Sequence, residues 1–134
     1  MKFLLDTNIC IYLIKRNHPE IFLKLIKIGF DNIFLSTISL AELEYGIANS
    51  KKSQESHVAL LEFTIPFGVL DFTNSAAHCY GRIRKELKDK GQPIGELDML
   101  IASIAMANNL TLVTNNEKEF NRISDLRIEN WKNK

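Results

Sequence analysis

Three acidic side chains, Asp6, Glu42 and Asp98, stand where an apolar run or a loop passes into a helical pattern. Asp6 ends a short apolar run that is typical of a buried parallel strand. Glu42 follows a second such run, and Asp98 opens an apolar helical pattern after Gly95. The carboxyl ends of parallel strands share one edge of a sheet, which is where open α/β sheets place their ligands. We therefore expect the three carboxylates to converge.

Carboxylates brought together repel one another, and one of them takes up a proton unless a cation lies between them. Ligation by oxygen alone, without His or Cys, favours Mg²⁺ or Mn²⁺ over Zn²⁺. The histidines have no ligand partner at a metal-site spacing, and we interpret them as surface or core-edge residues: His18, His57 and His78. The sequence thus predicts a site for a hard divalent cation.

Each acid taken alone also has a structural interpretation. Asp6 suits a simple helix cap. Glu42 completes the capping-box pattern that begins at Ser39. Asp98 suits a carboxylate stabilised by the dipole of its own helix. The shared position of all three at helix starts is what favours a common site.

A fourth segment brings polar side chains to the same predicted edge. Asn116 and Glu119 follow the apolar run 110–114. An Asn oxygen can bind a hard cation or hold a metal-bound water, and it suits an Asx turn after a strand equally well. Glu119 either reaches the same edge or is a solvated charge. Side chains in place to hydrogen-bond the carboxylates or metal-bound waters, or else to cap helices and turns, are Thr7, Asn8 and Thr114.

Strands and helices alternate along the chain, which predicts an α/β fold with a mostly parallel central sheet of four to five strands covered on both faces. The expected strands are 3–5, 33–35, 67–72, 110–114 and, from a weaker pattern, 127–129. The expected helices run from a cap at 7 or 8 to about 15, over 19–28, 39–48 and 57–63, from a cap at 73 or 74 to 90, and over 97–107. The last of these is apolar almost all round and is expected to be the buried central helix.

Composition bounds the class of protein. The 134 residues are 46% hydrophobic and 25% charged, which predicts one globular domain over 1–134. The net charge of +1 means that only local patches would hold a nucleic acid. Cys10 and Cys79 are far apart and are expected to pack as small hydrophobes, in a reducing, cytoplasmic setting. We expect neither a signal peptide nor a membrane span, since Asp6 interrupts the opening apolar run and no other run is long enough.

Four blocks of sequence, in the same order along the chain, resemble the PIN-domain ribonucleases and, within them, the VapC-type toxins of bacterial toxin–antitoxin pairs. The blocks are 4–8, 39–43, 93–102 and 112–116. The resemblance implies a PIN-like α/β/α sandwich and Mg²⁺-dependent cleavage of RNA phosphodiester bonds, with Mn²⁺ as a substitute. It implies that Asp6, Glu42 and Asp98 form the family's acidic triad and bind the metal. The family's fourth position is often Asp and here is Asn116, so Glu119 is the acid that would supply the missing charge.

The same resemblance implies partners. The ending 126–131 is similar to the subgroup that cuts initiator tRNA in the anticodon loop. The family implies a homodimer and a VapB-type antitoxin, which covers the toxin's groove and contacts promoter DNA. The amphipathic runs 21–28 and 58–63 either host that partner or face the core. Candidate RNA contacts, each also consistent with a solvated helix face, are Lys51, Lys52, Arg82, Arg84, Lys85 and Lys88. Burial in the core or an interface is expected, in preference to stacking on bases, for the aromatic residues Phe30, Phe34, Phe67 and Trp131.

Two other interpretations remain at this point. In a phosphoryl-accepting signalling domain, Asp71 would be the acceptor after the third strand. Against it, Asp6 has no adjacent acid and no predicted strand ends in a lysine. The second is a catalytically silent partner with the same fold, for which Asn116 is the only support.

Overall fold

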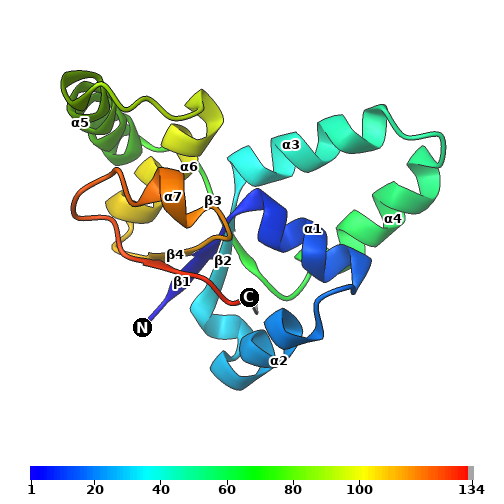
Figure 1. Cartoon of the computed structure of the whole chain (residues 1–134). Coiled ribbons are helices and arrows are strands. Elements are labelled where there is room, and N and C mark those ends of the chain that lie inside the picture. The colour runs from blue at the N-terminus through cyan, green and yellow to red at the C-terminus, as the bar shows by residue number, and fades with distance from the viewer. Residues whose placement is uncertain (133–134) are drawn as a thin grey trace.

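A computed structural model describes residues 1–132 of the chain. The predicted domain extends to residue 134, so its last two residues lie outside the described part. Five short strands form a central sheet in the order β3-β2-β1-β4-β5, and all four strand pairs are parallel (Figure 1). The strands are β1 (Phe3–Leu5), β2 (Ile33–Ser36), β3 (Gly68–Leu70), β4 (Thr111–Val113) and β5 (Ile128–Glu129). The predicted parallel sheet of four to five strands is confirmed.

Helices connect the strands and cover both faces of the sheet (Figure 1). They are α1 (Thr7–Lys15), α2 (Pro19–Ile28), the short 3-10 helix η1 (Phe30–Asn32), α3 (Thr37–Ala48), α4 (Ser53–Thr64), α5 (Asn74–Lys90), α6 (Glu96–Ala107) and α7 (Glu117–Phe120). Helices α5, α6 and α7 lie on one side of the sheet, and α1 and α2 lie on the other, while α3 and α4 form an antiparallel pair that projects beyond it. The α/β/α sandwich expected from the alternation of elements is therefore confirmed.

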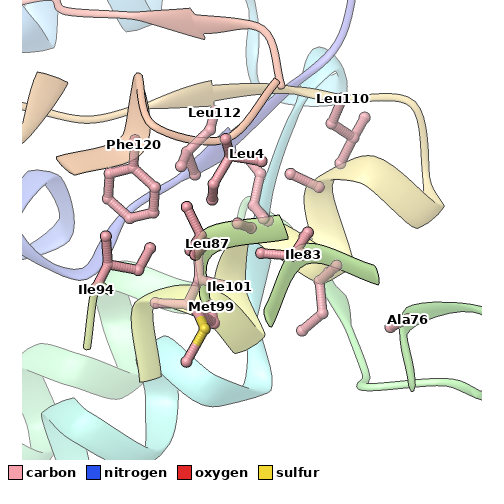
Figure 2. Packing of buried hydrophobic residues seen from close by; sticks show 14 residues of the cluster. Leu4, Ala76, Ile83, Leu87, Ile94, Met99, Ile101, Leu110, Leu112 and Phe120 are labelled. Atoms are coloured by element: carbon pink, nitrogen blue, oxygen red, sulfur yellow. The ribbon is translucent and has the colours of Figure 1, made fainter. Parts of the chain in front are cut away.

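The alternation of side chains along β1 divides the core in two. Leu4 packs in the cluster under α5, α6 and α7, together with Leu112 of β4 and Leu87 of α5 (Figure 2). Phe3 and Leu5 pack in the cluster on the opposite face, against α1 and α2. Successive side chains of a strand point to opposite faces, and a strand buried on both sides therefore reads as a continuous apolar run. That is why three apolar residues sufficed to predict this strand.

Helix α6 is the buried helix that its composition predicts. Met99 and residues 101–105 are buried, and most of them belong to the cluster shown in Figure 2. Leu97, in its first turn, is an exception and is 47% exposed. The aromatic side chains also follow the core interpretation, since Phe67 and Trp131 are buried and Phe30 and Phe34 are partly buried against the core clusters. Trp131 packs edge to face on Phe3 at 5.3 Å between ring centroids. No helix within residues 1–132 is both long enough and apolar enough to cross a membrane.

Some element boundaries differ from those predicted. Helix α3 begins at Thr37, two residues earlier than expected, because Ser36 caps it by accepting a hydrogen bond from the Ser39 N–H at 3.0 Å. Strand β3 is shorter than the predicted run 67–72, and α4 begins before residue 57. Two short elements, η1 and α7, were not predicted, because three or four residues carry too little periodicity to identify a helix.

The strand order reverses beside β1, at the carboxyl ends of β1 and β4, a region here called the crevice. From β1 the chain crosses to β2 on one side, and β4 later takes its place on the other side. Such a reversal in strand order is where open α/β sheets bind their ligands, at the carboxyl ends of the strands. Asp6 follows β1 at this point, and Thr114 follows β4.

Candidate active site

Asp6 lies buried at the head of the crevice and caps α1. Its side chain is 4% exposed, and its Oδ1 accepts a hydrogen bond from the Thr7 N–H at 2.7 Å. Its Oδ2 accepts a second bond from the Thr114 hydroxyl at 2.8 Å, across from the neighbouring strand end. The expectation that Thr7 or Asn8 caps this helix was wrong. The Asp6 backbone is still extended when the helix begins, so Asp6 itself takes the cap position.

The surroundings of Asp6 disfavour its negative charge. Burial raises the pKa of the Asp6 carboxyl, the bonds from Thr114 and Thr7 partly offset that effect, and the charge of Glu42 raises the pKa further. The carboxylate is thus held in place by neutral donors, in a position where a cation would stabilise it.

The Glu42 side chain contacts Thr7, the residue after Asp6, and takes no part in capping its own helix. Its Oε1 accepts a hydrogen bond from the Thr7 hydroxyl at 2.7 Å. The capping box that the sequence suggested is absent from this described helix start, because Ser36 is the cap and Glu42 lies in the second turn of α3. Ser39 is instead fully buried, with its hydroxyl 2.9 Å from that of Thr7. Ser39 was not assigned to the site from the sequence, because its spacing to Glu42 indicated a helix cap.

Asp98 lies in the first turn of α6, as predicted, and is half-buried. Burial and then the negative charges of Asp6, Glu119 and Glu42 raise its pKa to about 6. Its Oδ2 lies beside Gly95, where an added Cβ would come within 3.6 Å of it. Charges from three other segments of the chain therefore act on this one carboxyl group.

Asn116 and Glu119 are joined to each other and to the crevice. The Asn116 side-chain N–H₂ donates to Glu119 Oε2 at 3.1 Å, so Glu119 is more than a solvated charge. The Asn116 backbone N–H donates to the Thr114 hydroxyl at 3.0 Å. Thr114, and not an Asn side chain, therefore makes the turn bond after β4. Its hydroxyl links Asn116 to Asp6, because it also donates to the Asp6 carboxylate.

The donor set suits a hard cation. Within residues 1–132, no three His, Cys, Asp or Glu side chains are grouped closely enough to hold a metal ion as they stand. The carboxyl groups that act on one another supply oxygen alone, and burial together with like charge raises the pKa of both Asp6 and Asp98. A divalent cation would reverse both causes of that shift, and oxygen ligands are those that Mg²⁺ and Mn²⁺ prefer. The residues present therefore fit such an ion.

The other candidate residues lie elsewhere. His18 is 3.6 Å from Glu20, and His57 is 3.7 Å from Glu44, as expected for surface or core-edge residues. Asp71 is exposed after the edge strand β3, which β2 separates from β1. The basic candidates are all exposed: Lys51, Lys52, Arg82, Arg84, Lys85 and Lys88. Asn8 is exposed as well.

A groove of about 590 Å³ lies between α1, α2 and α4. Both amphipathic runs singled out in the sequence contribute to it, with Phe22 and Leu25 from α2 and Phe63 from α4. Its full lining is Tyr12, Leu13, Ile14, Arg16, His18, Pro19, Phe22, Leu25, Phe30, Ala59, Glu62, Phe63, Pro66 and Phe67. The Tyr12 hydroxyl accepts a long hydrogen bond from the Asn115 side chain at 3.4 Å, so the groove adjoins the segment that follows β4.

The PIN-domain family matches residues 3–126 of the chain. Ribonuclease VapC2 of Rickettsia felis is 45% identical over 133 residues, covering 98% of each chain. The chain belongs to the VapC ribonucleases of the PIN-domain family. Another relative is the tRNA(fMet)-specific endonuclease VapC of Salmonella typhimurium, 42% identical over 132 residues and 98% of each chain. The crystal structure of VapBC2 from Rickettsia felis, bound to a DNA fragment from its promoter, matches with a TM-score of 0.93 and 43% identity, over 98% of this chain and 100% of that one. The family resemblance drawn from the four sequence blocks is confirmed.

Proposed function

We propose that this chain is a toxic endoribonuclease that hydrolyses RNA phosphodiester bonds with a bound Mg²⁺ ion, for which Mn²⁺ can substitute. The observation that carries the metal assignment is the buried Asp6 carboxylate at the crevice, together with the acids whose charges raise the pKa of Asp98. Ribonuclease activity is the common property of the VapC relatives by name. A signalling role for Asp71 is disfavoured, because it follows the edge strand and not β1.

We assign direct metal contact to Asp6 and Asp98, with Glu42 completing the set or orienting the attacking water. Asn116 and Glu119 form the fourth corner of the site. When bound, the cation would lower the pKa of a water molecule and offset charge that builds on the phosphate. The chain's own hydroxyl groups hold the acids: Thr114 fixes one Asp6 oxygen, and Thr7 fixes one oxygen of Glu42. These bonds orient the carboxylates before a substrate arrives.

We infer that the substrate is initiator tRNA. Two relatives, from Shigella flexneri and Salmonella typhimurium, are named tRNA(fMet)-specific endonucleases and are 38% and 42% identical to this chain. The enzyme would act in the cytoplasm, where this substrate is found. Exposed cations on α5 are the candidates to contact its phosphates, and one of them, Arg84, lies 3.9 Å from Glu96 in the first turn of α6.

A VapB-type antitoxin neutralises the toxin, and we assign the groove between α1, α2 and α4 to its binding segment. The groove is lined mainly by apolar side chains and includes the partly exposed Phe22. Its link to the acidic edge runs from Tyr12 to Asn115, so a segment bound there would lie close to the metal site. Contact with promoter DNA would come through the antitoxin, and the active form would be a homodimer.

The test replaces Asp6 by Asn, which remains a good helix cap but loses the charge. We expect cleavage of an initiator tRNA transcript to fall by about 100-fold or more, because a metal contact contributes several kcal/mol to the transition state. Asp71→Asn, at another strand end, is the matched control and should stay fully active. A chelator should stop cleavage by the native chain. Native rates in Asp6→Asn, or cleavage that resists the chelator, would overturn the assignment.

A further inference from the structure

Arg122, which directly follows the α7 region, joins two segments that carry acids of the proposed site. Its Nη1 donates a hydrogen bond to the Pro93 carbonyl at 2.9 Å. Its backbone N–H donates to the Glu119 carbonyl at 3.1 Å. One residue thus connects the loop before α6 to the helix that carries Glu119.

A second set of bonds ties Arg122 to the last turn of α5. Lys90 Nζ donates to the Arg122 carbonyl at 3.1 Å and to Glu86 Oε2 at 2.6 Å. The same Glu86 oxygen accepts from the Ser124 N–H at 3.1 Å. The bond from Lys90 keeps the pKa of Glu86 below its usual value, so this carboxylate stays charged. These bonds hold the backbone of residues 122 and 124 against α5, and thereby the point from which the Arg122 side chain extends.

The loop that Arg122 contacts determines where α6 begins. Pro93 has no backbone N–H, so its carbonyl is its only backbone group able to hydrogen-bond. The next residue, Ile94, is buried in the same core cluster as Phe120 of α7 (Figure 2). Gly95 then accepts the Met99 N–H at 3.0 Å and starts the helix. A shift of Pro93 would consequently move the first turn of α6, which carries Asp98.

We propose that Arg122 is a positioning residue that fixes the separation of Asp98 and Glu119 and thereby sets the affinity of the site for its divalent cation. This inference rests on the proposed function. Arg122 acts through the Pro93 carbonyl and through Glu119, and the metal contacts belong to the acids. Its role follows from two bonds made by one residue to both acid-bearing segments.

The chain provides a matched control at the opposite end of α6. Arg127 Nη2 donates to the Asn109 carbonyl and to Asn109 Oδ1, both at 2.9 Å. Like Arg122, it is a cation of the C-terminal segment that holds a loop adjoining α6. A helix of this length separates the two loops by about 18 Å, so Arg127 cannot affect the acids directly.

The experiment measures Mn²⁺ binding to the full chain, using the electron paramagnetic resonance signal of free Mn²⁺. We expect Arg122→Gln, whose amide is two bonds shorter than the guanidinium and would not reach the Pro93 carbonyl, to weaken binding about threefold to tenfold, the change that one hydrogen bond produces in an equilibrium constant. Arg122→Lys keeps a charged donor of nearly the same reach and should recover part of the affinity. Arg127→Gln should bind Mn²⁺ like the native chain. RNA cleavage by Arg122→Gln should recover its native kcat at saturating Mn²⁺.

The outcomes separate this inference from the function beneath it. If Arg122→Gln binds Mn²⁺ with unchanged affinity, while the native chain binds Mn²⁺ and cleaves RNA, only the positioning role is overturned. An equal loss in Arg127→Gln also overturns it, because general loosening of the fold would then explain the effect. If the native chain binds no Mn²⁺, the proposed metal site itself fails. Should Arg122→Gln not fold, Arg122→Met, which has no hydrogen-bond donor, replaces it, and a native Mn²⁺ affinity in that variant overturns the role.

Discussion

The two oxygens of the Asp6 side chain have separate partners. One oxygen caps α1, and the other accepts a hydrogen bond from Thr114 across the crevice. Capping orients the carboxylate, and burial makes its charge costly without a cation. The cap therefore holds Asp6 in the orientation that the proposed metal contact needs. Glu42 differs, because its expected capping role is absent at the described start of α3 and its contact is with Thr7.

The raised pKa of Asp98 predicts how metal binding depends on pH. Its folded-state pKa is about 6 and its ordinary value is 3.8, so the metal-free fold loses stability as pH rises through that interval. A cation competes with the proton, so the Mg²⁺-induced rise in Tm should be small at about pH 5 and larger at about pH 7.5. Asp98→Asn should remove most of this pH dependence. Thermal unfolding with and without Mg²⁺ measures it, and equal Mg²⁺ effects at both pH values would refute it.

At the scale of elements, those buried on all sides could be predicted from sequence, whereas the very short helices could not. The run 3–5 and the helix over 97–107 were identified because burial on all sides leaves a continuous apolar pattern. The start of α3 was misplaced because Ser36 and Ser39 are equally good caps by residue type, and only the backbone distinguishes them. Helix α7, which carries Glu119, is four residues long and has no pattern to detect.

The edge strand β3 gives a prediction at this scale. A Cβ at Gly68 would lie 2.8 Å from Cδ1 and 2.9 Å from Cε1 of the Phe34 ring on β2. Gly68→Ala should therefore lower the free energy of unfolding by about 1–3 kcal/mol, the cost of overpacking. At Gly46, in α3, an added Cβ would meet no described atom within 4 Å apart from its chain neighbours and the nearby backbone of its own helix. Gly46→Ala is the control and should gain about 0.5–1 kcal/mol. Urea unfolding measures both, and a neutral Gly68→Ala would show that Phe34 moves aside freely.

At the scale of the whole molecule, Thr7 and Thr114 were predicted to hydrogen-bond the carboxylates, but which acid each of them contacts was not. Sequence spacing singled out Asp6, Glu42 and Asp98 as candidates because each stands near a helix start. Their hydrogen-bond partners come from distant segments: Thr114 is 108 residues from Asp6, and Glu42 is 35 residues from Thr7. Only the strand order brings these segments together, and no local pattern encodes it. The groove likewise combines the two amphipathic runs 21–28 and 58–63, for which the sequence did not distinguish packing in the core from binding a partner.

The last prediction concerns the groove, because two neighbouring exposed residues of α2 differ in whether they line it. Phe22 lines the groove and is 53% exposed, whereas Leu23 is 67% exposed and does not line it. Phe22→Asp would place a charge in an apolar site and should weaken antitoxin binding by about tenfold or more, with RNA cleavage unchanged. Leu23→Asp carries the same charge on the same helix and should bind normally. Co-purification with the cognate VapB-type antitoxin, and relief of growth arrest by it, measure the difference. Equal antitoxin binding by both variants would place the antitoxin elsewhere, since a charge introduced into an occupied apolar groove must lower the affinity.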